Sequence, residues 1–295
     1  MNSVTSKILV TGSSGFIGQR LLHMYGLCGL HAIKTTRDRE EVDESTIFLD
    51  LSSDEPIPLS GFDTVVHLAG VAHRKHKLDN EFHEINFKAT ERFVSACADA
   101  GVKQFIFLSS IGVNGTYNEV AFTETDEPAP KGEYAISKLN AENSIERVCN
   151  NSNMSFILIR PPLVYGPGAP GNISSLVKAM KMLIPMPFGW VKNRRHFCHL
   201  DNLTSFILEC TGAGDNKKIN NQVFLISDDC AMTTPQFIRA IGLMHKQRPV
   251  LLGFPVALLF FALAAVSRGL VESLLLDLQV SNEKAKKLTG WRPLC

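Results

Sequence analysis

Two side chains suited to proton transfer stand four residues apart in this sequence, Tyr134 and Lys138. They follow Pro128, Pro130 and Gly132, which predict that a helix begins here, so the spacing places both side chains on one helix face. A free phenol has a pKa near ~10, too high for acid–base work at neutral pH, but a nearby ammonium favours the phenolate. The pair therefore predicts a general acid or base, although the same spacing also occurs by chance in many helices.

A serine at the end of an apolar strand supplies a third group. Ser110 follows the strand predicted over 104–109, about 25 residues before Tyr134. Its hydroxyl can hydrogen-bond the same carbonyl or alcohol oxygen that Tyr134 would protonate or deprotonate. Serine, tyrosine and lysine are thus predicted to form the catalytic group, and a simple turn hydroxyl is the alternative for Ser110.

The segment that must position this group is the glycine-rich T-G-S-S-G-F-I-G, residues 11–18, directly after the apolar run 7–10. It reads as strand, tight turn and helix, the arrangement of a dinucleotide site. Gly12 permits the turn, Gly15 lets the backbone approach a pyrophosphate, and Gly18 lets the helix lie close on the strand. Phe16 and Ile17, within the same turn, are expected to contact the dinucleotide. An ordinary strand-to-helix turn is the alternative.

Strands and helices alternate through the first half of the chain. The predicted strands are 7–11, 31–35, 46–49, 64–68, 104–109 and 155–159, and the predicted helices are 16–27, 79–100 and 134–150. Such alternation indicates an α/β fold with a doubly wound parallel sheet, a Rossmann fold. We expect an NAD(P)-binding Rossmann domain over 1–160 and a smaller C-terminal α/β substrate-binding lobe over 161–295, where the chain returns to the sheet in part.

Composition narrows the classes of partner. With 45% hydrophobic residues the chain can bury a large core, and its net charge of +1 gives no bulk field that would favour nucleic acid. Its seven cysteines are scattered, odd in number and never in a C-x-x-C pair, so neither a disulfide framework nor a metal site is expected. The first six residues show no signal peptide. A reducing cytoplasm is the expected location.

The end of the second strand bears on the choice of cofactor. An NAD site usually has an acidic residue here, which binds the ribose 2′-hydroxyl, but this sequence reads T-T-R-D-R over 35–39. A guanidinium at Arg37 suits a 2′-phosphate by bidentate hydrogen bonding. NADP(H) is therefore favoured. NAD(H) is the alternative, in which Arg37 is a solvated loop residue and Asp38 binds the ribose.

Further motifs carry a resemblance to a known family. The segment R-P-P-L-V-Y-G-P-G over 160–168 and the closing S-N-E-K-A-K-K-L-T-G-W-R-P over 281–293 join the glycine turn and the Y-x-x-x-K pair. Together they resemble the extended short-chain dehydrogenase/reductases, the NAD-dependent epimerase/dehydratase family, and within it the bacterial UDP-sugar 4-ketoreductase/4-epimerase branch. The resemblance covers nearly the whole chain.

This resemblance implies further site residues. For the cofactor it implies that Asp50 and Leu51 contact the adenine and that the strand end Leu68, Ala69 and Gly70 lies along the dinucleotide. It also implies that Asn86 supports the site and that the backbone of Ser109, Pro161 and Val164 lies against the nicotinamide, beside Tyr134 and Lys138 themselves. For a UDP-sugar it implies Asn172 as a helix N-cap near a phosphate, Phe188 near the uracil and Arg195 on the diphosphate. Lys88-Ala89 departs from the family's x-Gly after Asn86, and core or loop roles are the alternatives for Phe188 and Asp50.

Function is expected to follow from these sites. Ile111 and Gly112 after Ser110 lack the extra acid and base of a dehydratase. The favoured reaction is reduction of the 4-keto group of a UDP-linked 6-deoxy-N-acetylhexosamine for surface polysaccharides. A UDP-sugar 4-epimerase and a non-catalytic dinucleotide sensor are the alternatives. We also expect a homodimer. Residues 250–266 are expected to form a buried or partly exposed helix, and a membrane-surface or partner-binding helix is the alternative.

Overall fold

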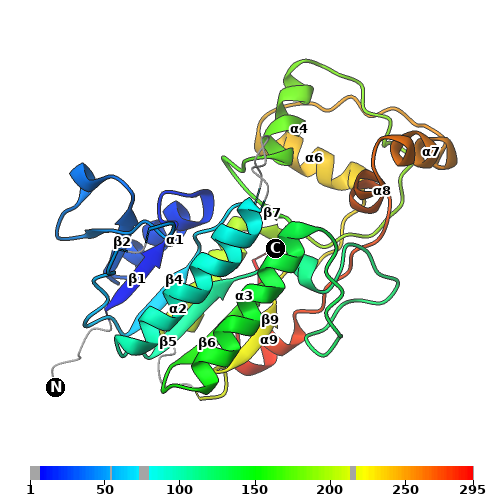
Figure 1. The fold of residues 1–295 in the computed structure, drawn as a ribbon. Coiled ribbons are helices and arrows are strands. Elements are labelled where there is room, and N and C mark those ends of the chain that lie inside the picture. The colour runs from blue at the N-terminus through cyan, green and yellow to red at the C-terminus, as the bar shows by residue number, and fades with distance from the viewer. Residues whose placement is uncertain (1–6, 54, 73–79, 213–216, 295) are drawn as a thin grey trace.

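Seven parallel strands form one sheet in the order β3-β2-β1-β4-β5-β6-β9 (Figure 1). The computed structural model describes residues 7–53, 55–72, 80–212 and 217–294. The strands are β1 Ile8–Thr11, β2 Ala32–Thr36, β3 Thr46–Phe48, β4 Thr64–His67, β5 Gln104–Leu108, β6 Ser155–Arg160 and β9 Gln222–Leu225. The order reverses between β1 and β4, so the carboxyl ends of these two strands flank the crevice where doubly wound sheets bind ligands. The predicted doubly wound fold is confirmed.

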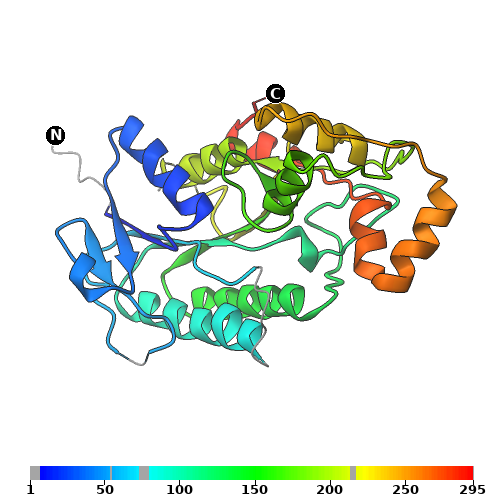
Figure 2. The same cartoon turned by 90° about the horizontal axis from the view of Figure 1, so that it is seen from above.

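Helices cover both faces of the sheet, as Figure 2 shows from above. On one face lie α1 Phe16–Leu27, α5 Leu200–Gly212 and α9 Glu283–Thr289; on the other lie the π-helical segment η2 Phe82–Lys88, α2 Ala89–Asp99 and α3 Glu133–Asn150. The helix predicted over 16–27 has these bounds, and α3 begins one residue before the prediction. The helix predicted over 79–100 is divided into η2 and α2, and Asp79 lies outside the described residues.

Each strand contributes side chains to two apolar cores, because alternate residues of a strand point to opposite faces. Val10 and Val66 pack on the face of α1 and α5, whereas Leu9 and Val65 pack on the face of α2 and α3. All four side chains are fully buried. Their burial on both faces explains the nearly continuous apolar runs by which these strands were predicted.

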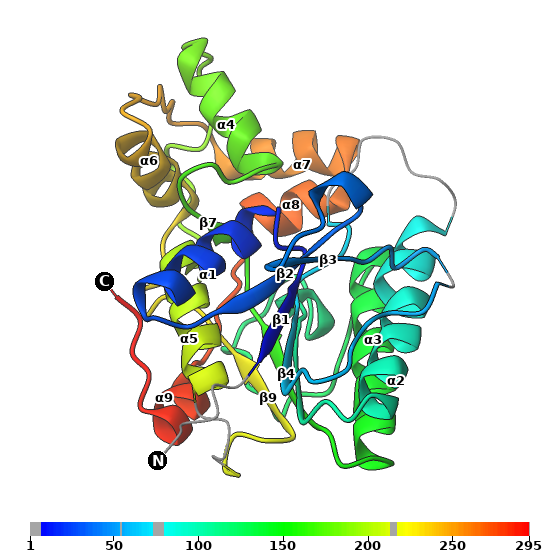
Figure 3. The same cartoon turned by 90° about the vertical axis from the view of Figure 1, so that its left-hand side faces the viewer.

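A second group of elements lies beyond the carboxyl ends of the strands (Figure 1, Figure 3). It contains α4 Asn172–Lys181, α6 Thr234–Met244, α7 Val256–Val266, α8 Arg268–Leu274 and the parallel pair β7 Val164–Tyr165 and β8 Cys198–His199. Short 3-10 turns, η1 Arg39–Glu41 and η3 Ile111–Val113, follow β2 and β5. None of the described helices is long and apolar enough to cross a bilayer.

The start of α4 differs from the prediction. Gly171, not Asn172, occupies the N-cap, and Asn172 is the first helical residue, with an exposed side chain. Gly171 has φ 66° and ψ −127°, a conformation that only glycine adopts readily. The chain therefore turns into the helix at the glycine, and the predicted capping role of Asn172 is wrong.

Candidate active site

The glycine turn brings the ends of β1 and β4 together. Gly12 has φ +65°, and a Cβ there would lie 2.7 Å from the backbone nitrogen of Ala69. A Cβ on Gly18 would lie 2.3 Å from the carbonyl oxygen of Gly12. Neither position can accept a side chain without moving backbone, so both glycines act as predicted on the strand-to-helix turn. Gly15 is the N-cap of α1 and donates its N–H to the Gly12 carbonyl (3.0 Å).

The first turn of α1 presents backbone N–H groups with no side-chain cap and no acidic residue. Such a helix start attracts phosphate oxygens. The Ser13 hydroxyl fixes the loop by donating to the Thr35 carbonyl (2.9 Å). Phe16 and Ile17, predicted to contact the cofactor, are half-buried and pack against two different apolar clusters. Their side chains thus also anchor the helix.

The three predicted catalytic side chains meet where the carboxyl end of β5 lies beside the first turns of α3. Ser110 hydrogen-bonds the Tyr134 phenol, and its Oγ also accepts the Gly112 N–H (3.1 Å). The Lys138 Nζ donates to the Leu108 carbonyl (2.9 Å) at the end of β5 and lies 4.6 Å from the centre of the Phe107 ring. The sequence prediction that these groups converge is therefore consistent with the geometry.

Electrostatics differ from the expectation for this pair. Burial raises the pKa of Tyr134, and the hydrogen bond with Ser110 offsets part of that rise. Burial also lowers the pKa of Lys138 to about 8, against an opposing effect of Glu142. The ammonium is directed at the Leu108 carbonyl, and it is not among the groups that shift the Tyr134 pKa. The expected lowering of the phenol pKa by Lys138 is thus absent from the protein alone.

Asn86 lies in the π-helical segment η2 and links three parts of the site. Its side chain accepts the Val71 N–H (2.8 Å) and donates to the Val71 carbonyl (3.0 Å) and the Ser137 hydroxyl (3.3 Å). A Cβ on Gly70 would lie 3.0 Å from Asn86 Oδ1 and 3.4 Å from Lys138 Nζ. The loop after β4 therefore passes directly over both side chains, and the predicted contact of Leu68, Ala69 and Gly70 with the dinucleotide stays a prediction. π-Helical turns such as η2 are frequent at functional sites.

A buried ion pair, not predicted from the sequence, fixes α3 to the end of β6. Arg160 donates from Nε to Glu142 (2.9 Å) and from Nη2 (2.5 Å), and its Nη1 donates to Asn114 (3.0 Å). Glu142 follows Lys138 by one helical turn, so the pair holds the helix that carries the catalytic side chains. The four-residue spacing of Lys138 and Glu142 indicates that they share a helix face. A glutamate in a charged helix is usually solvated, however, so the sequence does not predict its buried ion pair.

A second missed cluster lies beneath the glycine turn. His67, the last residue of β4, is fully buried between the hydroxyls of Thr11 (Nδ1, 2.7 Å) and Thr90 (Nε2, 3.1 Å). Thr11 Oγ1 also accepts the Ala69 N–H (3.3 Å). Burial, reinforced by the charge of Lys138, lowers the pKa of His67 to about 3. The neutral ring ties β1, β4 and α2 together immediately below the site.

At the end of β2 the side chains are exposed. Asp38 caps η1 by accepting the Glu40 N–H (2.9 Å), and Arg39 donates to Glu55 (2.6 Å) and stacks on Phe48. The Arg37 side chain is exposed and makes no hydrogen bond or ion pair with the described residues. Thr36 donates to Glu41 (2.7 Å). Of the three charged residues in this turn, only Arg37 has a charged group without a hydrogen-bond or ion-pair partner among the described residues.

The remaining cofactor residues lie along the same edge. Asp50 accepts the backbone N–H (2.9 Å) and hydroxyl (2.6 Å) of Ser52, which lower its pKa, with a smaller effect of Arg37. The Leu51 carbonyl accepts a bond from Arg92 (3.0 Å). The Pro161 carbonyl accepts the Ile111 N–H (2.9 Å), and Val164 begins β7.

The predicted substrate residues do not form one cluster. Phe188 packs between two apolar clusters of the second group of elements, which favours its core role. Arg195 is buried, and its Nη1 donates to the carbonyls of Glu272 (2.7 Å) and Leu276 (2.8 Å). Burial lowers the pKa of Arg195 to about 10. Arg195 therefore holds α8 and the segment after it in place, and its contact with a diphosphate stays a prediction.

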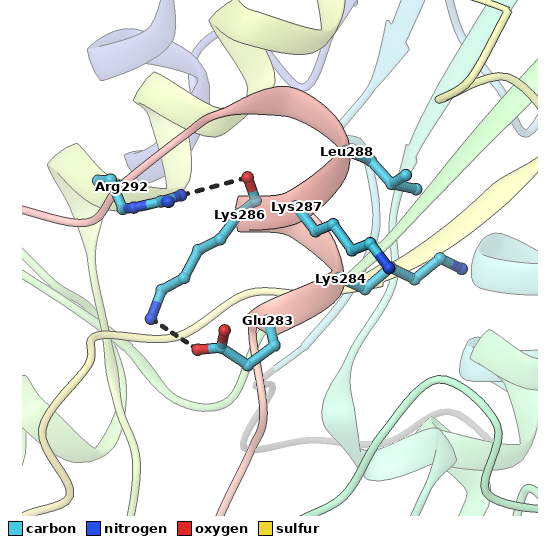
Figure 4. Close-up of a pocket in the computed structure, with 6 residues that line it drawn as sticks. All are labelled: Glu283, Lys284, Lys286, Lys287, Leu288 and Arg292. Carbon is cyan, nitrogen blue, oxygen red and sulfur yellow. Dashed lines mark hydrogen bonds and ion pairs between the residues drawn. The ribbon is translucent and has the colours of Figure 1, made fainter.

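A hollow of basic character lies elsewhere, on α9 (Figure 4). Its lining residues are Glu283, Lys284, Lys286, Lys287, Leu288 and Arg292. Lys284 donates to the Val223 carbonyl near the start of β9, which places the hollow away from the carboxyl ends of the strands. Lys286 is already paired with Asp229 and Glu283, so the hollow offers a poor anion site.

The carboxyl edge of the sheet fits a dinucleotide. Its glycine turn admits no side chain at Gly12, its helix start is uncapped, and the buried hydroxyl of Ser109 has no hydrogen-bond partner in the described structure. An unpaired buried hydroxyl beside Ser110 is costly unless a ligand meets it. The described residues contain no group of three or more His, Cys, Asp or Glu side chains that could hold a metal ion.

Comparisons with known proteins agree with this geometry. Residues 8–225 match the NAD dependent epimerase/dehydratase family. The chain is 33% identical to a UDP-glucose 4-epimerase of Vibrio cholerae, over 97% of this chain and 90% of that protein. It is 27% identical to the N-acetyl-alpha-D-glucosaminyl-diphospho-ditrans,octacis-undecaprenol 4-epimerase of Escherichia coli O157:H7, over 69% of this chain and 62% of that protein. The fold resembles that of UDP-glucuronic acid 4-epimerase from Bacillus cereus in complex with NAD, with a TM-score of 0.78 at 20% identity, over 98% and 94% of the two chains.

Proposed function

Because the chain belongs to the NAD-dependent epimerase/dehydratase family, we propose that it exchanges a hydride at C4 of a UDP-linked sugar. The observation that carries this proposal is the convergence of Ser110, Tyr134 and Lys138 at the carboxyl end of β5, on the same edge of the parallel sheet as the glycine turn. Retention of all three side chains argues against a non-catalytic dinucleotide sensor. The chain is an NAD(P)-dependent enzyme of the nucleotide-sugar epimerase and reductase group.

Each side chain has a defined task in this proposal. Tyr134 Oη gives a proton to the C4 oxygen on reduction, or takes it on oxidation. Ser110 Oγ, already hydrogen-bonded to the phenol, donates to the same sugar oxygen and holds it next to Tyr134. Lys138 would hold the ribose of the dinucleotide, and that cofactor would supply or accept the hydride at C4. With that ribose in place the ammonium would also favour the phenolate.

The favoured net reaction is reduction of the 4-keto group of a UDP-linked 6-deoxy-N-acetylhexosamine, with NADP(H). Its support is the uncommitted guanidinium of Arg37, which suits a 2′-phosphate at the end of β2. Asp38 does not oppose a phosphate there, because its carboxylate caps η1. Glu41, hydrogen-bonded to Thr36, is the acid that would favour a ribose hydroxyl and hence NAD.

Epimerisation of a UDP-sugar at C4 is the second candidate. It is supported by the Vibrio cholerae relative, a UDP-glucose 4-epimerase that matches 97% of this chain. Both reactions use hydride transfer at C4 and proton transfer at its oxygen. An epimerase would oxidise and then reduce C4 and keep its NAD bound, whereas a reductase would only reduce C4 and release the oxidised dinucleotide after each turnover.

Substrate contacts, domain division and assembly complete the proposal. We place the sugar nucleotide between the Rossmann domain, 1–160, and the lobe, 161–295, with Arg195 and the start of α4 near its diphosphate. We also propose a homodimer, to be tested by light scattering.

A cytoplasmic location is supported by the free thiols of the described cysteines, which are Cys28, Cys97, Cys149, Cys198, Cys210 and Cys230.

The net reaction is tested by incubating the enzyme with NADPH and a panel of UDP-sugars and UDP-4-keto sugars. A reductase consumes one NADPH for each 4-keto sugar and leaves UDP-glucose unchanged. An enzyme that carries bound NAD and interconverts UDP-glucose and UDP-galactose without added cofactor is an epimerase. Absorbance at the NADPH band and the stereochemistry of the product distinguish the two.

Arg37→Ala tests the cofactor preference. We expect the parent to bind NADPH more tightly than NADH, and the variant to lose about ten- to a hundredfold in NADPH affinity with NADH nearly unchanged. Glu41→Gln serves as the matched variant, because removing the acid should widen the preference for NADPH. Equal NADPH binding by the parent and Arg37→Ala would remove the argument for reduction.

A further inference from the structure

The helix α7 has a composition that its surroundings do not explain. All eleven of its residues are apolar, V-A-L-L-F-F-A-L-A-A-V, yet only Leu259 is buried. Leu259 and the half-buried Leu263 pack on one side against Val191, Val271 and Leu275. A surface helix of a globular protein normally carries polar residues on its outer side. The outer side of α7 is therefore an apolar face with no cover in the described structure.

The exposed side chains on this face are large. Phe261 is 71% exposed, Leu258 58% and Val266 75%, and Phe260, the neighbour of Phe261, is 42% exposed. The face continues before the helix through Leu252, Phe254 and Trp190. Trp190 belongs to the same surface because a Cβ on Gly253 would lie 2.3 Å from its Nε1. Together these residues form the apolar face of the lobe.

The segments that carry this face have charges of one sign. Residues 161–200 and 230–271, which include α4, α6, α7 and the first residues of α8, contain nine Lys and Arg residues and no Asp or Glu. The next residue of α8, Glu272, is paired with Lys131. The rest of the chain has 21 Lys and Arg against 29 Asp and Glu, a net charge of −8. Two of the nine stand at the ends of the apolar face: Lys192 follows Trp190 by two residues, and Arg268 follows Val266 by two. Both are exposed and have no ion-pair partner among the described residues.

We propose that the apolar face of the lobe docks on the surface of an anionic lipid bilayer. α7 would lie in the plane of the interface, with Phe261 and Leu258 among the acyl chains and Trp190 at headgroup level. Lys192 and Arg268 would contact lipid phosphates at either end of the helix. With eleven residues, α7 is far shorter than the ~20 needed to span the hydrocarbon core, so the contact is peripheral.

Charge decides between a bilayer and a second copy of this chain. A twofold contact places the same patch of both subunits together, so it would bring segments 161–200 and 230–271 of two copies, which hold cations and no acidic residue, against one another. An anionic lipid surface pairs with those cations instead. The same charges would steer the lobe toward such a surface at low ionic strength.

Vesicle flotation tests the proposal with the full chain. We expect binding to vesicles of phosphatidylcholine with 30% phosphatidylglycerol, and about tenfold or greater loss of binding in Phe261→Asp. Leu27→Asp is the matched control, because Leu27 is 73% exposed at the end of α1 in the sheet layer, and it should bind as the parent does. Arg268→Gln should lose about fivefold, only on the anionic vesicles.

Two outcomes would overturn the proposal. One is absence of flotation with anionic vesicles at low salt. The other is a parent oligomer that Phe261→Asp converts to a smaller species in light scattering, without any vesicle binding by either, since that result assigns the face to a second copy. Leu258→Asp, which removes a second exposed side chain of α7, should repeat the result of Phe261→Asp.

Discussion

Two ends of the same cofactor crevice are built in opposite ways. At the ends of β4, β5 and β6 the polar groups are buried and bonded to one another: Asn86 to Val71, Lys138 to the Leu108 carbonyl, and Arg160 to Glu142. At the end of β2 the charged groups are exposed: Arg37 has no partner among the described residues, and Arg39 pairs with Glu55 at the surface. Contacts within the protein hold the side chains of the first end, which we call the fixed end. A bound ligand would order the side chains of the second, exposed end.

This contrast separates chemistry from cofactor choice. A proton donor must be held in one geometry, because catalysis depends on small displacements of the reacting atoms. A group that selects between two dinucleotides needs only to reach a ribose or its phosphate from solvent. Interior contacts therefore secure Tyr134 and Lys138, while the exposed Arg37 is the side chain that we propose selects between the two dinucleotides.

The largest expected effect is on turnover at the fixed end. Tyr134→Phe removes one oxygen and leaves the buried contacts of the site intact, so dinucleotide affinity should change little. Turnover should fall by roughly 10²–10⁴-fold, the range for a lost general acid. Steady-state kinetics with the sugar identified by the panel assay, and dinucleotide titration, measure the two quantities.

Tyr117→Phe is the control for this change, because Tyr117 is 45% exposed and its ring faces Lys131 in a surface loop. It should keep the parent turnover. Near-normal turnover in Tyr134→Phe would mean that the fixed end holds a structural tyrosine and that another group moves the proton.

Stability gives the second comparison. Glu142→Gln leaves the guanidinium of Arg160 buried without its counter-charge, which should cost about 3–5 kcal/mol in the free energy of unfolding. Glu55→Gln removes the partner of Arg39 in a pair whose side chains are both more than half exposed, so it should cost about 1 kcal/mol or less. Denaturant unfolding of the two variants measures both. Equal losses would show that the two ends of the crevice are equally fixed.

Much of the fixed end could be predicted from the sequence because its signals are local. Glycines spaced by three after a strand, a tyrosine and lysine one helical turn apart, and a strand that ends in Ser109-Ser110 all lie within short windows. The same holds for β1, β4, β5 and β6 and for α1 and α3, whose apolar patterns match their burial, whereas β2 has no buried residue.

The rest depends on contacts between distant segments. Glu142 looks like a solvated helix residue until β6 brings Arg160 to it. Arg195 looks like an anion-binding arginine until α8 and the segment after it bring one carbonyl each to its guanidinium. β7 and β8 have two residues each, too few for any periodicity. At the exposed end the sequence leaves Arg37 and Asp38 as alternatives for binding the ribose or its phosphate, and the structure shows that Asp38 caps η1.

His67 gives the smallest expected effect and a test that needs no substrate. The unfolded chain binds a proton at this residue near pH ~6.5, whereas burial lowers the folded pKa to about 3. Above pH 6.5 both states are neutral here, and His67 contributes no pH dependence. Between pH 6.5 and 3 only the unfolded state takes up the proton, so the stability of the protein falls as the pH falls. From pH 7 to pH 5 this linkage amounts to about 2 kcal/mol.

His67→Gln should lose that part of the pH dependence of the unfolding free energy in denaturant unfolding. His23→Gln, on the exposed side of α1, serves as the control for removing a histidine elsewhere. If His67→Gln kept the full pH dependence of the unfolding free energy, the His67 ring between Thr11 and Thr90 would be accessible to water. The residues beneath the glycine turn would then be as solvent-accessible as those at the end of β2.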